Sequence, residues 1–577
     1  MKFSFFQLFT FREKFFFIML LILNIIATSL ELISLSTIPL FITVIIDPIN
    51  LKLIPIVGPF LDELIIIKKL DYERILFYSS ISLVLVFLVK NLFLFFLILF
   101  ETQIAKNLKI TFGLKLFKFY VTQPIFFHLS NSQSKLIRNM QIEASKAVSV
   151  IFLYINIFKE FLFLFAVSIL LLFTNFLTTI SIFIILSISS FFYFFLVKKK
   201  LGLYGIQNLK FKTEKIKFIN FSLSSIKDIK IFLSELWISK MFSFNTTQLE
   251  NNVRKSLVIQ KSTKLYLELI GIIIILTIAF LTLSEQNFKQ SLPILSLFVV
   301  SIVKLSPSIN TILSSLSSIK FNKPSLNAIG DDIVKYNQKP ISLKKKNYKK
   351  IKNIKKIQLK NISFKNIDKK NYLFKNLNLD FYSNNIYGVI GKSGSGKSTF
   401  LNLISTLIRP SNGIIKIDGK KLSFKDINYI KNLGYVAQDS KLIHGTLRDN
   451  IVFGNSKEKN NDLDLVKLIK DVGLSNFYKK LDNGLNTLIE DDGKKISGGE
   501  KQRIIICRSL YKNSSVLLFD EPTTGLDKYN EYKFLSLIKK IKKDKIIFMS
   551  FHNLRHKRMC DYLLKIDEKN NLKLSKN

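Results

Sequence analysis

The amino-acid sequence predicts a chain of two unlike parts, an α-helical membrane domain with six spans followed by an α/β domain with a helical subdomain. Three observations lead to this fold class. Up to about residue 320, apolar residues gather in segments too long for the core of a water-soluble domain. From about residue 357, short apolar strands alternate with amphipathic segments. A glycine-rich loop at 391–399 joins one of these strands to a helix, a connection typical of α/β domains.

Six apolar segments reach the length that a membrane-spanning helix needs, roughly 20 residues. Buried helices of a soluble protein are the alternative, but six such segments would require an implausibly large core. We therefore expect a transmembrane domain over residues 1–320. The expected spans are 15–44, 75–100, 151–174, 177–197, 265–284 and 291–318.

The connections between the expected spans alternate between short and long, and the long ones are basic. The loop 101–150 carries seven Lys or Arg residues against two Glu, and the loop 198–264 begins with three lysines. Because cytosolic loops of membrane proteins carry an excess of Lys and Arg, we expect both long loops and both termini in the cytosol. The chain is then a multi-pass protein of the cytoplasmic membrane.

Charged residues inside the expected spans indicate a functional role, since a charge in lipid is costly. Lys90 and Lys304 interrupt apolar runs, and Glu31, Glu160 and Glu268 lie in or near other spans. Two interpretations stay open. In one, the lysines line a cavity and contact an anionic group. In the other, they either pair with the glutamates of neighbouring helices or extend toward the membrane surface.

Residues 321–356 lack the pattern of a span and end in a lysine-rich run, so we expect a solvated linker there and the α/β domain over 357–577. The formal net charge of +44 is compatible with nucleic-acid binding. However, lysine is abundant in the loops, the linker and the expected surface alike, and the chain has six expected spans. Composition therefore explains much of the charge, and we expect no nucleic-acid partner.

The sequence Gly391–Thr399 reads GKSGSGKST and matches the phosphate-binding loop G-x-x-x-x-G-K-[ST]. The apolar run 386–390 before it suits a buried strand, and 400–404 after it suits the start of a helix. Glycines let backbone N–H groups surround phosphates, and the helix N-terminus adds partial positive charge. Lys397 would then reach the β- and γ-phosphates, and Ser398 would hold Mg²⁺. The predicted phosphate-binding residues are Gly391, Lys392, Ser393, Gly394, Ser395, Gly396, Lys397, Ser398 and Thr399.

Two carboxylates follow a second apolar strand, which begins at Val516. A hard cation needs oxygen ligands, so Asp520 is a candidate to hold Mg²⁺ directly or through water. Glu521 can then orient and polarise the water that attacks the γ-phosphate. Together with the phosphate loop, these residues predict a P-loop ATPase that uses ATP and Mg²⁺.

At this point the chain resembles an ABC transporter half-molecule of the exporter type, with fused membrane and ATPase domains. The segment Ile496–Arg503, ISGGEKQR, resembles the signature of that family. The resemblance implies that the signature contacts ATP bound to another subunit, so that a chain with one ATPase domain pairs, most simply as a homodimer. The signature residues implied to contact ATP are Ser497, Gly498, Gly499 and Glu500.

The resemblance also assigns three further positions. Gln438 matches the glutamine that contacts Mg²⁺ and water, and Thr524–Asp527 matches a loop that crosses the dimer interface. His552 matches the histidine that contacts the γ-phosphate, with His556 as the competing choice. The implied catalytic residues are Glu521, His552 and Lys397, and the implied metal-binding residues are Ser398, Gln438 and Asp520.

Two features of the sequence depart from the family pattern. Asn366 stands where an aromatic residue usually stacks on adenine, and Phe364 or Tyr372 would have to substitute. The signature begins with Ile496 and carries Glu500, where Leu and Gln are commoner. The catalytic set is complete, so the resemblance implies two equivalent, hydrolytically competent sites in a homodimer.

The cargo is suggested by four segments, at 121–132, 136–144, 225–232 and 305–312, which look like those of the branch that flips lipid-linked oligosaccharides. The resemblance implies an ATP-driven exporter or flippase for a lipid-linked substrate, with a pyrophosphate-linked oligosaccharide as the first candidate and membrane lipid around the protein. The alternatives are an exporter of another lipid, a peptide or a drug, and a membrane-bound regulatory ATPase without transport. Two regions of the long loops, 124–140 and 217–230, are expected to dock on ATPase domains.

Overall fold

The computed structural model describes residues 5–46, 72–172, 176–283, 288–338, 353–365, 371–424, 426–454, 462–490, 496–551, 554–567 and 572–577. The chain divides into two compact units. The first comprises Met1–Gln123 and Phe127–Ser342, and the second comprises Pro124–Phe126 and Leu343–Asn577.

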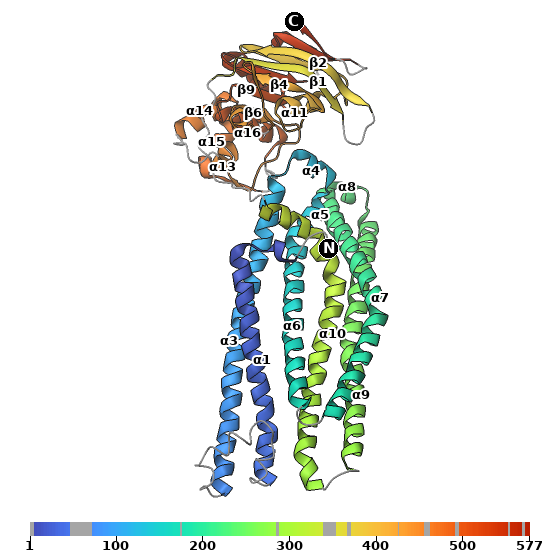
Figure 1. Ribbon diagram of the computed structural model, residues 1–577. Helices are drawn as coiled ribbons and strands as arrows, with labels where there is room; N and C mark the ends of the chain where they lie inside the picture. Colours follow the sequence, from blue (N-terminus) through green and yellow to red (C-terminus); the bar gives the residue numbers. More distant parts are fainter. Residues whose placement is uncertain are drawn as a thin grey trace. The chain divides into compact units, whose positions relative to one another are not determined.

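The first unit is built from long helices that run side by side (Figure 1). A short 3₁₀ helix, η1 (Phe5–Leu8), precedes them. The long helices are α1 (Phe11–Ile46), α3 (Tyr72–Val121), α6 (Ala144–Leu172), α7 (Phe176–Ser224), α9 (Glu235–Leu283) and α10 (Phe288–Gln338).

Four helical segments among the described residues are long and apolar enough to cross a membrane: Phe11–Ile42, Glu73–Val121, Gln133–Ile169 and Thr179–Ser224. They contain, wholly or in large part, the first four expected spans. The fifth and sixth expected spans lie on α9 and α10, where many side chains fall outside the described residues. The helices also expose large apolar side chains such as Phe96, Phe191 and Leu276, as helices surrounded by lipid do.

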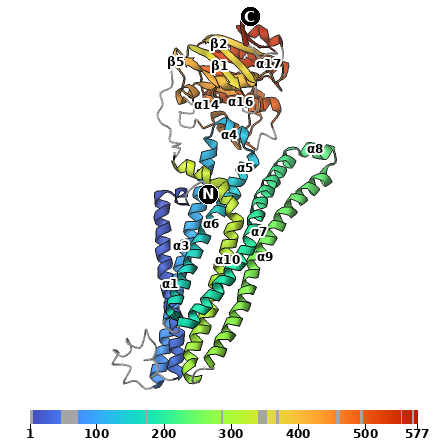
Figure 2. The same ribbon diagram turned by 45° about the vertical axis from the view of Figure 1, so that its right-hand side comes forward.

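The helices are much longer than a bilayer is thick. At 1.5 Å per residue, the 50 residues of α3 extend about 75 Å, against a hydrocarbon core of about 30 Å. The expected long loops are therefore largely helical. The loop 101–150 contains the end of α3, then α4 (Ile125–Ser130), α5 (Gln133–Arg138) and the π-helical turn η4 (Asn139–Glu143). The loop 198–264 is the hairpin in which α8 (Ile226–Ile231) joins α7 to α9 (Figure 2).

The predicted linker differs from the structure over its first part. Helix α10 continues past residue 320 to Gln338, and the first unit extends to Ser342. The reason is a helical repeat of apolar residues: Leu326, Ile329 and Ile333 are fully buried in the core of the first unit. Residues 339–352 lie outside the described part of the chain.

The second unit contains a six-stranded sheet in the order β12-β11-β3-β10-β9-β6. The five strands from β11 to β6 are parallel, and β12 pairs with β11 in the antiparallel direction. The strands are β3 (Asn385–Ile390), β6 (Leu433–Val436), β9 (Val516–Asp520), β10 (Ile546–Ser550), β11 (Tyr562–Ile566) and β12 (Leu572–Lys576).

Alternate residues of the central strands enter two hydrophobic cores, one on each face of the sheet. Leu518 and Phe548 pack in one core with α11 (Lys397–Ile404) and the second sheet. Leu517 and Met549 pack in the other core, among helices. The second sheet is antiparallel, in the order β2-β1-β4-β5. Its strands are β1 (Lys356–Lys365), β2 (Tyr372–Tyr382), β4 (Asn412–Ile417) and β5 (Lys420–Lys421).

Short helices gather beside α16 (Gly498–Tyr511), as the predicted helical subdomain requires (Figure 1). They are α13 (Leu447–Val452), α14 (Asp462–Asp471), α15 (Ser475–Lys479) and η5 (Gly484–Asn486). Two short antiparallel strands, β7 (Gly445–Thr446) before α13 and β8 (Leu488–Ile489) after η5, pair with each other and so bring together the two ends of this group of helices. The remaining helices of the unit are α12 (Ile427–Lys431), α17 (Lys528–Ile541) and η7 (Leu554–Met559).

Candidate functional site

The predicted site lies at one edge of the parallel sheet, because the carboxyl ends of parallel strands meet there. Strand β3 ends at Ile390, directly before the phosphate loop. In the next strand, β10, the last residue Ser550 pairs in register with Val389 of β3 and with Asp520 of β9. Gln438 follows two residues after the end of β6. The fold thus brings together side chains that are far apart in the sequence.

The phosphate loop has a backbone that needs glycine. Gly394 and Gly396 have φ angles of +76° and +102°, in the left-handed region that residues with a Cβ atom rarely adopt. A Cβ atom at Gly391 would lie 2.5 Å from the Ser395 hydroxyl oxygen. Gly396 then caps α11, so the positive end of this helix opens onto the loop.

Lys397, the first residue of α11, turns its side chain back over the loop. Its ammonium donates hydrogen bonds to the carbonyl oxygens of Gly391 and Lys392, at 3.0 and 3.2 Å, and only 5% of the residue is exposed. Ser398 and Thr399 occupy the first turn of α11 and are half-buried. The charge and the hydroxyl groups are therefore positioned beside backbone N–H groups, an arrangement that suits a phosphate chain.

Three predicted residues meet around the end of β9. Asp520 is almost fully buried, with 2% of the residue exposed. The Ser550 hydroxyl donates to Asp520 Oδ1 at 2.6 Å and accepts from the Glu521 N–H at 3.0 Å. The Gln438 amide donates to Glu521 Oε2 at 3.2 Å. Asp520, Glu521 and Gln438 therefore belong to one hydrogen-bonded group, with Ser550 as a fourth member.

Glu521 has an unusual backbone conformation. Its φ angle is +51°, in the left-handed region, which costs free energy for a residue with a long side chain. The hydrogen bond from its N–H to Ser550 helps to hold this conformation. The chain turns away from the strand immediately after Asp520. The two consecutive carboxylates therefore have different hydrogen-bond partners, Ser550 for Asp520 and Gln438 for Glu521.

Two residues of the site were missed by the sequence reasoning. Ser550 carries the only hydroxyl in the apolar strand IIFMS, and that contrast was a usable signal. Tyr435 on β6 donates a hydrogen bond to Asn402 Oδ1 on α11 at 3.0 Å. Burial, together with the negative charge of Asp520, raises the pKa of Tyr435 well above its ordinary value. The phenol is therefore neutral and links the helix of the phosphate loop to β6.

The oxygen donors near this edge fit a magnesium ion. Mg²⁺ prefers oxygen ligands and is commonly held by one or two protein groups together with phosphate oxygens. Asp520 offers a buried carboxylate, Ser398 a hydroxyl and Gln438 an amide oxygen. Within the described residues, no group of three or more His, Cys, Asp or Glu side chains forms a separate metal cluster. The residues thus suit a cation that arrives with a phosphate chain.

The signature segment forms a capping box at the start of α16. The Ser497 hydroxyl accepts from the Glu500 N–H at 3.3 Å, and Glu500 Oε2 accepts from the Ser497 N–H at 2.9 Å. The Ser497 hydroxyl also donates to Glu500 Oε2 at 2.8 Å. Glu500, one of the two departures from the family pattern, therefore stabilises the helix N-terminus.

The signature also contacts the loop 524–527 closely. A Cβ atom at Gly499 would lie 2.9 Å from the Gly525 carbonyl oxygen, and Gly525 itself has a φ angle of +84°. Asp527 caps α17 by accepting from the Asn530 N–H at 2.8 Å. Two loops with expected roles at a subunit interface are thus built against each other.

Some predicted residues remain predictions. His552 and Asn366 lie outside the described residues. The competing histidine, His556, is buried and its Nε2 atom lies 2.5 Å from Glu531 Oε1 on α17, so it has a structural contact within the unit. Phe364 is only 4% exposed and belongs to the hydrophobic core, whereas Tyr372 is 37% exposed. Of the two aromatic substitutes for adenine stacking, only Tyr372 has a free ring surface.

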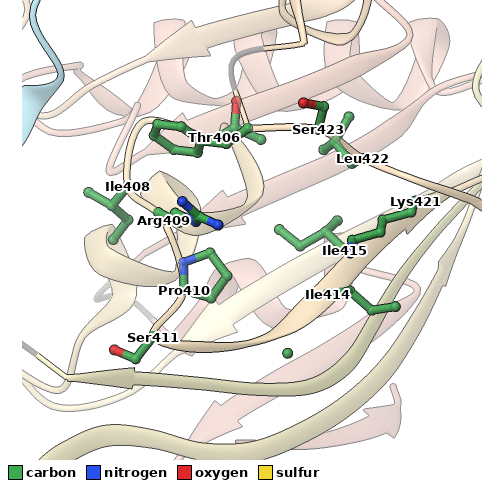
Figure 3. Close-up of a pocket in the computed structure, with 12 residues that line it drawn as sticks. Thr406, Ile408, Arg409, Pro410, Ser411, Ile414, Ile415, Lys421, Leu422 and Ser423 are labelled. Atoms are coloured by element: carbon green, nitrogen blue, oxygen red, sulfur yellow. The ribbon is translucent and has the colours of Figure 1, made fainter.

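A separate hollow of about 490 Å³ lies beside β4 and β5, at one edge of the antiparallel sheet (Figure 3). Arg409 and Lys421 supply cationic side chains to its walls, and the Thr406 hydroxyl is buried there. None of the predicted site residues lines it. This hollow is therefore distinct from the phosphate loop and its neighbouring carboxylates.

Comparison with known proteins finds a family match within the second unit. Residues 374–524 match the sequence model of the family described as ABC transporter. A putative export ATP-binding/permease protein of Rickettsia prowazekii is 39% identical over 193 residues, which is 33% of each chain. A toxin RTX-I translocation ATP-binding protein of Actinobacillus pleuropneumoniae is 34% identical over 196 residues, or 33% of this chain and 27% of that protein. The match thus spans about a third of the length of these relatives.

The whole chain resembles a solved structure in fold. A bacterial Atm1-family ABC exporter with ATP bound superposes with a TM-score of 0.79 at 18% identity, over 98% of this chain and 96% of that one. The predicted fold class is confirmed: a unit of long, membrane-length helices is joined to an α/β unit that matches the ABC transporter family model over residues 374–524.

Proposed function

We propose that this chain is one half of an ATP-driven ABC exporter that moves an amphipathic, lipid-linked substrate across the cytoplasmic membrane. The observation that carries the proposal is the hydrogen-bonded group of Asp520, Glu521, Gln438 and Ser550. This group lies at the same sheet edge as the phosphate loop, in a chain whose other unit consists of membrane-length helices.

Each residue of the site has a distinct task in ATP hydrolysis. The backbone N–H groups of the loop and the Lys397 ammonium bind the phosphates and withdraw negative charge from them. Asp520, Ser398 and Gln438 would hold Mg²⁺, which neutralises charge on the phosphate oxygens when it is bound. Glu521 orients the attacking water and accepts its proton, and His552 contacts the γ-phosphate. Phosphoryl transfer depends mainly on such positioning and charge stabilisation.

The protein is expected to work as a homodimer. The capping box of Ser497 and Glu500 leaves the N-terminus of α16 exposed, with Gly498 at the surface. A helix N-terminus attracts an anion, and in this proposal the anion is the triphosphate bound by a second copy. ATP would then contact both copies only in the closed pair. That difference in contacts is what shifts the equilibrium toward closure.

Closure has to be transmitted to the membrane helices. The bends at 124–140 and 217–230 remain the expected docking regions. Directly after the second region, Ile231, Phe232 and Leu233 are between 74% and 81% exposed, which supports a role for this part of the hairpin in contacting another surface. ATP-driven closure would draw such bends together and turn the substrate cavity outward, and release of phosphate would reset it.

The cargo is proposed from the segments at 121–132, 136–144, 225–232 and 305–312. They favour a lipid-linked substrate, with a pyrophosphate-linked oligosaccharide as the first candidate. The names of the relatives, which refer to export and to toxin translocation, keep other cargo open. Another lipid, a peptide or a drug is the alternative within the same mechanism.

The ATPase part is tested with the purified full chain in lipid. We expect Mg²⁺-dependent ATP hydrolysis that Glu521→Gln reduces by at least ~100-fold, because the water loses its base. The matched control is Asp464→Asn, an exposed carboxylate on α14, which should retain full activity. Equal activity of Glu521→Gln and the parent protein would contradict the assigned mechanism.

A further inference from the structure

The membrane unit contains a cavity whose walls combine charged and apolar side chains. It measures about 300 Å³, at the lower end of the ~300–1,000 Å³ typical of ligand pockets. Helices α1, α3, α6 and α10 all contribute to it, so it lies between helices rather than on the outside of one. The lining residues are Glu31, Ser34, Leu35, Ile38, Phe87, Lys90, Glu160, Phe163, Val303, Pro307 and Ser308.

The charged residues come from three different helices. Lys90 on α3 is only 9% exposed, and its ammonium lies 4.4 Å from the centre of the Phe87 ring. Glu31 on α1 and Glu160 on α6 complete the charged part of the lining. The Lys159 ammonium also lies 3.8 Å from Glu31 Oε1. The cavity therefore brings one lysine and two glutamates to the same small space.

Lys90, which interrupts an apolar run of the sequence, is thus part of the charged lining of this cavity. Lys90 lines a cavity that Glu31 and Glu160 also line, and both interpretations of the lysine stay open. The side chain of Lys304 lies outside the described residues. A cluster of ionisable groups between membrane helices is costly and points to a functional site. An ion cluster that only holds helices together needs no surrounding hollow, whereas a binding site does.

The walls define the chemistry of a ligand. An ammonium binds anionic oxygens, whereas carboxylates bind N–H or O–H donors. Ser34 and Ser308 add hydroxyl groups, and Ser308 is a hydrogen-bonding neighbour of Glu160. Phe87, Phe163 and the aliphatic residues suit an apolar chain or the face of a ring. A ligand with negative charge alone would meet one lysine and two carboxylates, so part of the site would repel it.

We propose that this cavity binds the head group of an amphiphile that carries both an anionic group and hydrogen-bond donors. The anionic group pairs with Lys90, and ammonium or hydroxyl donors bind Glu160 and Glu31. As a site for transported substrate, the cavity rests on the proposed function. Phosphoethanolamine and phosphosugar head groups share this chemistry, and the two differ in whether the donors are N–H or O–H groups.

The test is direct binding to the purified full chain in lipid nanodiscs, without ATP, measured by native mass spectrometry. The probes are decyl phosphoethanolamine, a decyl phosphosugar and decyl phosphate. We expect one or both of the donor-bearing probes to bind at least about tenfold more tightly than decyl phosphate. The donor-bearing probe that binds more tightly identifies the source of the donors.

Variants then assign the binding to the cavity. Lys90→Met should weaken binding of the donor-bearing probes about tenfold or more, and Glu160→Gln should weaken them without weakening decyl phosphate. Lys106→Met is the matched control, an exposed lysine on the same helix, and should bind like the parent. Gel filtration and thermal unfolding in nanodiscs confirm that each variant is folded.

Two results would overturn the proposal: decyl phosphate binding as tightly as the donor-bearing probes, or folded Lys90→Met and Glu160→Gln proteins binding all probes like the parent. Because binding is measured without ATP, this failure is distinguishable from a failure of the ATPase mechanism. A protein that hydrolyses ATP but does not bind these probes retains the exporter proposal and loses this site.

Discussion

At the scale of single residues, Ser550 connects the parts of the proposed ATP site that the sequence keeps apart. Its hydroxyl bonds both Asp520 and the N–H of Glu521, so it fixes the carboxylate proposed for Mg²⁺ and the residue proposed as base. It touches neither ATP nor water in this account and is therefore a positioning residue. Its loss should affect the rate of the chemical step more than the binding of nucleotide.

We predict that Ser550→Ala lowers kcat for ATP about tenfold and leaves KM nearly unchanged. Hydrogen bonds to charged groups contribute ~1.5–3 kcal/mol, and tenfold in rate corresponds to ~1.4 kcal/mol. Steady-state kinetics in lipid measure the effect, with Ser575→Ala on the exposed side of β12 as the control. A change in KM alone, with kcat retained, would refute the positioning role.

A second prediction concerns pH and Tyr387, which lies on β3 three residues before Ile390. Burial raises the pKa of Tyr387 to about 12, from an ordinary value of 10.0. Between these values the unfolded chain has lost the phenol proton and the folded unit retains it. The free energy of unfolding should therefore fall as pH rises from about 10 to 12, by up to ~1.4 kcal/mol per pH unit from this group.

The Tyr387→Phe variant isolates that contribution. It should be less stable near neutral pH by about 1 kcal/mol, because the hydroxyl donates to the Tyr382 carbonyl and accepts from its N–H. Between pH 10 and 12, however, its stability should fall less steeply than that of the parent. Chemical unfolding across this range measures both slopes, and parallel slopes would show that Tyr387 does not titrate as assigned.

At the scale of elements, the local motifs were predictable and the contacts between distant segments were not. The phosphate loop, its strand and its helix occupy one continuous stretch, 385–404, so pattern and structure are directly linked there. The hydroxyl of Ser550 stands out in its apolar strand, but its role depends on the pairing of β10 with β9, which that local contrast does not reveal. The linker prediction was wrong over its first part for a different reason, because a local pattern was present there but was not that of a membrane span. Leu326, Ile329 and Ile333 have helical spacing, but they lie beyond the long apolar run that marks a span.

The capping box of α16 gives an element-scale prediction. Glu500→Ala should lower the free energy of unfolding by ~0.5–2 kcal/mol, since the cap loses one partner. Glu500→Gln keeps a side-chain oxygen at the same position, so it should retain most of that stability. Because it also removes a negative charge near the proposed triphosphate of a second copy, it should strengthen ATP-dependent dimerisation.

Two measurements separate these effects. Chemical unfolding compares the stability of both variants with that of the parent, and size-exclusion chromatography with ATP, in the Glu521→Gln background, reports dimerisation. If Glu500→Gln weakened the dimer while leaving α16 stable, the carboxylate would have a positive role at the interface, contrary to this account.

At the scale of the whole molecule, the fold class was predictable because its two strongest signals are independent. Membrane-length helices indicate the first unit, and a phosphate loop indicates the second. Their order along the chain is that of an ABC exporter fold, and the structure has this fold. The identity of the cargo was harder to predict from the sequence. Helix packing brings Lys90, Glu31 and Glu160 to one cavity, although the sequence separates them by 59 residues or more.

ATP-driven transport by this chain is tested most directly by measuring the movement of substrate in proteoliposomes that contain no other protein. A polyprenyl-pyrophosphate oligosaccharide and the donor-bearing decyl probes serve as cargo, with ATP and Mg²⁺ supplied on the side of the ATPase domain. We predict ATP-dependent transfer of at least one of these cargo molecules by the parent protein and by Asp464→Asn, and no such transfer by Glu521→Gln. ATP hydrolysis at a normal rate, without transfer of any amphiphile tested, would contradict this prediction.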